Sequence, residues 1–243
     1  MVDSAARKRK SAWSQARTRV AKRRRVAPAS SSRPTTKVPV LQRITNGPAV
    51  ATGWTWPTTG ISVLLSKFKL GNDNDQRRGK ETLIYNVDVN LMGIIRQDQV
   101  VYCNRAWGMC WLLYDAQPSG NQPQCADVFD TAGETLVNRP TLWRVKKDMT
   151  HRFVIKRKWR IKMEVNGLAH STPCIPNSGV PPCDQEQSIQ HFVKGLNVRT
   201  EWKSTGNDGY GDISKGALLF LCAPAGGLNG TLAGNIRVYY KSL

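Results

Sequence analysis

Apolar and polar residues alternate with a period of two over a long stretch of this sequence, from residue 83 to residue 95. Because successive side chains of a strand point to opposite faces, the pattern predicts a strand with one buried face. Its expected buried positions are Leu83, Tyr85, Val87, Val89, Leu91 and Ile95. Similar segments recur between turns rich in Gly, Pro, Asn and Asp, at residues 61–70, 100–104, 108–114, 151–163, 196–203, 217–222 and 235–241.

These segments make eight expected strands, with one short helix expected near residues 126–134. No repeated helical pattern alternates with them, which argues against βαβ units. We therefore expect an all-β fold, an eight-stranded antiparallel sandwich or jelly roll.

Positive charge is concentrated at the start of the chain. The 243 residues carry a formal net charge of +19, and residues 1–43 hold 13 Lys or Arg and a single acid. This segment has no Ile, Phe or Tyr, so it cannot bury enough apolar surface to offset the cost of ordering its backbone. We expect two parts: a disordered basic arm at residues 1–43 and a β-domain at residues 44–243.

Two basic clusters in the arm, residues 7–10 and 22–25, are spaced like the halves of a bipartite nuclear import signal, which a host import receptor would bind. The same side chains suit phosphate neutralisation on nucleic acid. A merely solvated basic tail is the alternative interpretation. The residues expected to serve import and DNA binding are Arg7, Lys8, Arg9, Lys10, Arg17, Arg19, Lys22, Arg23, Arg24 and Arg25.

One predicted strand, residues 151–163, is basic on one face and apolar on the other. Its even positions include five cations expected to face DNA in one row, about 6.6–6.8 Å apart. The alternative is a solvated outer strand whose charges prevent edge-to-edge aggregation. The five expected DNA-facing residues are Arg152, Lys156, Lys158, Arg160 and Lys162.

Enzymatic and metal sites are not expected. The three histidines have no evident catalytic partners, and the sequence has no phosphate-binding glycine motif and no paired acidic cluster. Cys174 and Cys183 lie between His170 and His191, but their spacing is not that of a structural zinc site. Neither a cofactor nor a metal is expected, and the six cysteines should be free thiols.

No apolar stretch approaches the roughly 20 residues of a membrane span, so we expect no membrane insertion and a location in the cytosol or nucleus.

Several segments, taken in order along the chain, resemble the coat proteins of geminiviruses, and the likeness is nearer to the leafhopper-transmitted, mastrevirus-like members. It spans roughly residues 80–243, while the arm matches in composition only. The segments are WLLYD at 111–115, HRFVIKRKW at 151–159, MEVNG at 163–167, GLNVRTEWK at 195–203, KGALLFL at 215–221 and VYYKS at 238–242.

The resemblance implies a capsid protein with a single jelly roll. Pentameric units would assemble into two joined incomplete icosahedra around circular single-stranded DNA. It also implies entry into the host nucleus with viral DNA, passage through the host cytoplasm, and contributions to viral movement and insect transmission. The alternatives are a non-assembling nucleic-acid-binding shuttle protein and, less favoured, an enzyme acting on nucleic acid.

Overall fold

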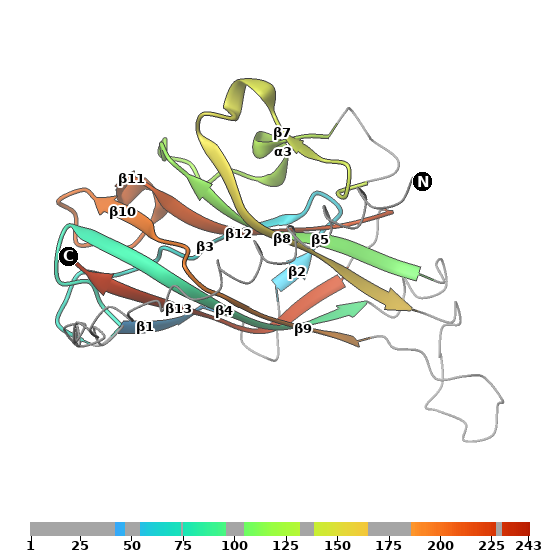
Figure 1. Ribbon diagram of the computed structural model, residues 1–243, viewed down its shortest axis with the longest axis horizontal. Coiled ribbons are helices and arrows are strands. Elements are labelled where there is room, and N and C mark those ends of the chain that lie inside the picture. The colour runs from blue at the N-terminus through green and yellow to red at the C-terminus, as the bar shows by residue number, and fades with distance from the viewer. Residues whose placement is uncertain are drawn as a thin grey trace, which may run out of the picture. The chain divides into compact units, whose positions relative to one another are not determined.

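The computed structural model describes residues 42–46, 54–73, 75–95, 105–131, 139–164, 186–226 and 230–243 (Figure 1). They form an almost entirely antiparallel β structure with very little helix, which confirms the all-β class. Two sheets lie one above the other and enclose the apolar core (Figure 1).

The larger sheet has seven strands. Its main path runs β1–β13–β4–β10–β11, while β2 also pairs with β13 and β9 also pairs with β4. The bounds are β1 Gln42–Asn46, β2 Trp54–Trp56, β4 Glu81–Ile95, β9 Glu186–Val193, β10 Val198–Trp202, β11 Ile213–Lys215 and β13 Gly230–Ser242.

The smaller sheet has four strands in the order β3–β12–β5–β8. Its central strand β12 is apolar at nearly every position, and every residue in it is buried, as expected of a strand covered on both faces. The bounds are β3 Ile61–Leu64, β5 Arg105–Asp115, β8 Phe153–Glu164 and β12 Ala217–Pro224.

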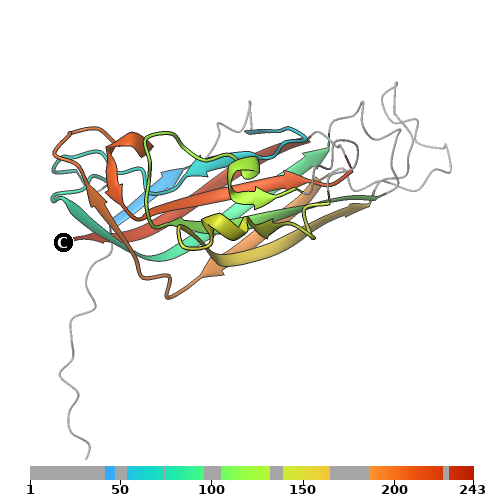
Figure 2. The same cartoon turned by 90° about the horizontal axis from the view of Figure 1, so that it is seen from above.

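A covering segment lies over the outer face of the four-stranded sheet. It contains helix α3, Cys125–Val128, and the short strands β6, Phe129–Asp130, and β7, Arg144–Val145. Figure 2 looks down on this segment, with α3 in front of the strands. Aromatic packing holds it there, because Trp111 of β5 lies 4.6 Å from Phe129 and 6.0 Å from Trp143, between ring centroids. The helix expected near residues 126–134 is therefore present but shorter, and residues 132–138 lie outside the described residues.

The alternation expected at residues 83–95 holds for Val87, Val89 and Leu91, which are all buried. It fails at the start of β4, where Ile84 is buried and Leu83 and Tyr85 are only half-buried. The register with β13 shifts here, since Tyr239 pairs with Asn86 whereas the next residue, Tyr240, pairs with Ile84. The bulge moves the buried face by one residue, so the expected placement of Leu83 and Tyr85 is wrong.

Strands that the sequence did not predict include β1, β2, β9 and β11. The strand predicted at residues 100–104 lies outside the described residues. Three cysteines, Cys110, Cys125 and Cys222, are buried and unbridged, as expected of free thiols.

Candidate nucleic-acid interface

β8 forms the edge of the four-stranded sheet and carries the basic residues that the sequence singled out. Over the part of the chain that the structure describes, β8 pairs with β5 alone, so its other edge has no strand partner. Its apolar residues Ile161 and Met163 are buried in the core, and Trp159 is half-buried. The expected strand with one apolar and one basic face is therefore present in the second half of β8.

The expected single row of five cations is interrupted by a β-bulge. Ile155 pairs with Leu113, but Arg157 pairs with the adjacent residue Leu112, which leaves Lys156 as the extra residue. Because Leu112 and Leu113 point to opposite faces of β5, their partners on β8 do so too. The placement of Lys156 in the same row as Lys158 is thus wrong.

Lys156 has a different neighbour on its own face. Its Nζ lies 5.1 Å from the ring centroid of Tyr114, which is on the same face of β5 as Leu112. Lys156 is half-buried as a residue, and its ammonium group is positioned for a cation–π contact.

Arg152 precedes β8 and forms a buried network. Its Nε and Nη2 atoms donate hydrogen bonds to the two carboxylate oxygens of Asp115, each at 2.9 Å, and Nη2 also donates to the hydroxyl of Tyr210. The Tyr210 hydroxyl in turn donates to Asp115, whose side chain is fully buried. Hydrogen bonding to Asp115 raises the pKa of Arg152, and burial, followed by Asp115, raises the pKa of Tyr210. Arg152 is therefore committed to an internal ion pair and not to the row predicted for it.

Lys158, Arg160 and Lys162 form the remaining row, which we call the cation row. All three are exposed, and their partners on β5 are Trp111, Met109 and Trp107. The guanidinium of Arg160 stacks over the ring of Trp107, with 4.6 Å from Cζ to the centroid. No ion pair within the described residues neutralises these three charges. They lie on the face of β8 opposite to the buried Ile161 and Met163, and two of them, Arg160 and Lys162, also line the hollow between β8 and β9.

A groove of about 240 Å³ lies between the edge strands β8 and β9, and we call it the β8–β9 groove. On one wall the imidazole of His191, an exposed residue, lies 4.9 Å from the ring of Trp159, with 44° between their planes. Among the described residues, the buried Nε1 of Trp159 has no hydrogen-bond partner. The residues lining the groove are Trp159, Arg160, Ile161, Lys162, Gln187, Ser188, Ile189 and His191.

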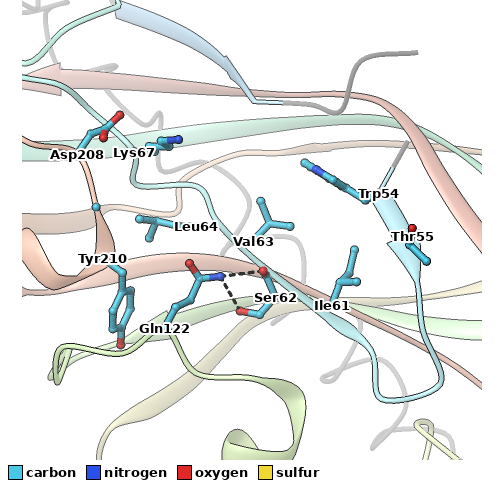
Figure 3. A pocket seen from close by; sticks show the side chains of 11 residues that line it. Trp54, Thr55, Ile61, Ser62, Val63, Leu64, Lys67, Gln122, Asp208 and Tyr210 are labelled. Atoms are coloured by element: carbon cyan, nitrogen blue, oxygen red, sulfur yellow. Dashed lines mark hydrogen bonds between the residues drawn. The ribbon is translucent and has the colours of Figure 1, made fainter. Parts of the chain in front are cut away.

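A second hollow, of about 530 Å³, is lined by residues of β2 and β3 and by nearby loops (Figure 3). Trp54, Ile61 and Val63 give it apolar surface, while Lys67 and Asp208 lie near one another at one end (Figure 3). The amide of Gln122 donates to the backbone oxygen and the hydroxyl of Ser62, at 2.7 and 3.2 Å. This hollow has no row of cations and is less suited to a polyanion.

All ten arm residues predicted for import and DNA binding lie outside the described residues, as do His170, Cys174 and Cys183. His191, the fourth residue considered as a zinc ligand in the sequence analysis, contacts Trp159. Over the described ranges, no group of three or more His, Cys, Asp or Glu is placed to hold a metal ion.

A sequence model of the geminivirus coat protein/nuclear export factor BR1 family matches residues 2–243 of this chain. The chain belongs to this family. The resemblance noted in the sequence is thereby confirmed.

The relatives of this coat protein are capsid proteins of mastreviruses. That of Maize streak virus genotype E (isolate Pat) is 38% identical over 189 residues, which are 78% of this chain and 77% of the relative. That of Panicum streak virus (isolate Kenya) is 36% identical over 234 residues, 96% of this chain and 94% of the relative. That of Maize streak virus genotype B (isolate Tas) is 34% identical over 217 residues, 89% of this chain and 86% of the relative. The chain is thus a viral coat protein, a structural component of a virion.

Sequence reasoning missed strand β9 of the coat protein, which lines the β8–β9 groove opposite β8. His191 was considered only as a metal ligand. A weak signal was present, because Ile189 and Val193 share one face of the strand and are buried, although His191 between them on that face is exposed. None of the helices in the described ranges is long and apolar enough to cross a membrane.

Proposed function

We propose that this coat protein assembles with copies of itself into a shell that encloses circular single-stranded DNA. The observation that carries the DNA-binding half of the proposal is the cation row, three exposed charges that no acid pairs with among the described side chains. Lys and Arg in such a row release condensed counterions when they meet phosphates, which favours binding whatever the base sequence. The capsid relatives support the assembly half.

The proposed fold of the subunit is a jelly roll. Its support is the strand order, with β2, β13, β4 and the β9/β10 pair in one sheet and β3, β12, β5 and β8 in the other. These eight positions fit the two four-stranded sheets of a jelly roll, a common architecture of virus capsids. On this proposal β1 and β11 are additions at the ends of the larger sheet.

The proposed quaternary structure is the family's twinned shell, with pentameric units in two joined T=1 icosahedra. The arm, residues 1–43, would lie on the DNA inside it. In the host cell the same arm would bind a nuclear import receptor, which makes the host nucleus, by way of the cytoplasm, a second location besides the virion. The viral movement protein and insect-vector factors are further proposed partners.

The test is assembly of the full chain with circular single-stranded DNA, followed by sedimentation, negative-stain imaging and nuclease digestion. We expect large particles and DNA that resists nuclease. A chain that binds DNA but sediments as a monomer, with and without it, would instead support the alternative of a non-assembling shuttle protein.

The contribution of the cation row is measured with the triple variant Lys158→Ala, Arg160→Ala, Lys162→Ala. Its slope of log affinity against log salt should flatten by about 2, at roughly 0.7 per phosphate contact. The matched control removes the same charges from exposed positions elsewhere, with Lys69→Ala, Arg78→Ala and Lys80→Ala. Equal flattening in both variants would show that only total charge matters.

A further inference from the structure

The β8–β9 groove has two unlike walls. The β8 wall carries Arg160 and Lys162 of the cation row, whereas the β9 wall carries no cation and presents the ring of His191. A single nucleic-acid strand has the same two-sided character, with phosphates along one side and flat bases on the other. The groove is therefore complementary to a single strand in a way that the cation row alone is not.

His191 is held in place although it is exposed. Its ring centroid lies 4.9 Å from that of Trp159, and the indole in turn lies 6.1 Å from Phe220 of the buried strand β12. A ring supported from behind has little freedom to lose when a second ring packs on it, which favours binding. Trp159 is thus a positioning residue for His191.

The size of the groove limits what it can take. At about 240 Å³ it is smaller than the roughly 300–1,000 Å³ that accommodates a drug-sized ligand. One base on the imidazole, with its neighbouring phosphates on Arg160 and Lys162, fits that volume. Stacking on an aromatic face also tolerates any base, as a protein that encloses a whole genome requires.

We propose that His191 is a base-stacking residue, which holds one base of a single DNA strand in the β8–β9 groove while Arg160 and Lys162 hold the adjacent phosphates. The proposal rests on the proposed DNA-binding function and adds to it a contact with the base. A segment of a second copy of this chain is the competing occupant, and the experiment below separates the two.

The first test compares two fluorescent strands of equal phosphate number, one of thymidine and one of abasic sugar, by anisotropy with the full chain. His191→Ala should weaken binding of the thymidine strand about five-fold or more and leave binding of the abasic strand unchanged. The salt slope on both strands should stay that of the unsubstituted chain, since no phosphate contact is lost.

Two further variants guard against a folding defect. His191→Phe keeps a flat ring and should retain the affinity for the thymidine strand. Gln190→Ala is the matched control, because Gln190 is exposed on the same strand but does not line the groove. It should bind both strands as the unsubstituted chain does.

The second test locates the contact by photocrosslinking a strand that carries 5-iodouracil and sequencing the crosslinked peptide by mass spectrometry. Crosslinks are expected at His191 or Trp159, and crosslinks confined to other peptides overturn the proposal. Equal loss on both strands in His191→Ala, or altered sedimentation with unaltered DNA binding, also overturns it, the latter in favour of a protein contact. If the unsubstituted chain binds neither strand, the proposed function itself is wrong.

Discussion

Asp115 illustrates how a single buried charge can organise several segments. It accepts hydrogen bonds from the guanidinium of Arg152, the hydroxyl of Tyr210 and the backbone N–H of Gln117, so it ties the end of β5 to the start of β8 and to the loop before β11. These donors satisfy the hydrogen-bonding capacity of the buried carboxylate, and its removal leaves the guanidinium without its partner.

Asp115→Ala should therefore lower the free energy of unfolding by about 3–5 kcal/mol. Denaturant unfolding followed by tryptophan fluorescence measures the change. The control is Asp148→Ala, at an exposed aspartate, for which a change within about 0.5 kcal/mol is expected. Equal midpoints for the two variants would contradict a structural role for the Asp115 network.

Cys125 makes the fold sensitive to alkali. Burial, followed by the neighbouring Cys110, raises the pKa of its thiol to about 12, from a usual value of 9.0. The unfolded chain then loses this proton first, so the stabilisation is complete below pH 9 and is lost as pH rises towards 12. Unfolding free energies measured from pH 8 to 11 should fall less steeply for Cys125→Ala than for the unsubstituted chain. Parallel curves would show that the thiol contributes nothing to the pH dependence.

At the residue scale, the sequence predicted the cation row correctly as an exposed feature but misassigned Arg152 and Lys156. The partner of Arg152 lies 37 residues earlier in the chain, and no local pattern reveals that Asp115 is buried beside it. The DNA-facing role of the row itself stays a prediction.

At the level of strands, bulges caused the wrong assignment of side chains to a face, at the start of β4 and at Lys156 in β8. A bulge in β8 depends on how it pairs with β5, and the shift at the start of β4 depends on its pairing with β13. Each is a property of two strands that are distant in sequence, so a single-strand alternation pattern cannot reveal it. The regular halves, Val87 to Leu91 and Trp159 to Met163, were predicted correctly because there the alternation is unbroken.

The turn between β11 and β12 requires a glycine for two separate reasons. Gly216 has φ of 72°, and a Cβ built there would lie 2.1 Å from the backbone oxygen of Arg199. Gly226 has a similar φ of 70°, but no described residue lies within 4 Å of such a Cβ. The two glycines therefore share the conformational requirement and differ in the close approach.

Gly226→Ala should lower the free energy of unfolding by about 1–2 kcal/mol, the cost of a left-handed alanine. Gly216→Ala should lower it by about 1–3 kcal/mol more, because the backbone of β10 must also shift. Thermal or denaturant unfolding of the pair tests this. A difference near zero would mean that the turn relaxes freely away from Arg199.

For the molecule as a whole, the uneven charge predicts that arm and body can be separated. Ten of the 13 basic residues of the arm lie within residues 1–26. Deleting residues 1–26 should abolish nuclear accumulation of a fluorescent fusion and flatten the salt slope for DNA binding by up to about 7. The unfolding midpoint of the body should not change.

The control for this deletion replaces the same ten basic residues by Gln and keeps the length of the arm. It should behave like the deletion in both assays, because charge and not length is the proposed cause. Normal nuclear accumulation of either variant would show that import does not depend on the arm.

The fold class was predictable because the all-β pattern is repeated along the body of the chain. The arrangement of the groove could not be predicted, because β8 and β9 belong to two different sheets. In addition, β9 has only two buried apolar residues, which is too few to predict a strand from the sequence. Assignments that depend on how sheets pack need the three-dimensional structure.

β13 comes after every other described strand in the sequence, yet it lies in the interior of the seven-stranded sheet, where it pairs with β1, β2 and β4. During synthesis the larger sheet consequently cannot close until the ribosome has passed residue 242. A chain released before about residue 230 would expose the bare edge of β4 along its whole length, an open template for aggregation. Interrupted translation should thus yield insoluble fragments, so that only subunits that contain β13 enter the pool available for particle formation.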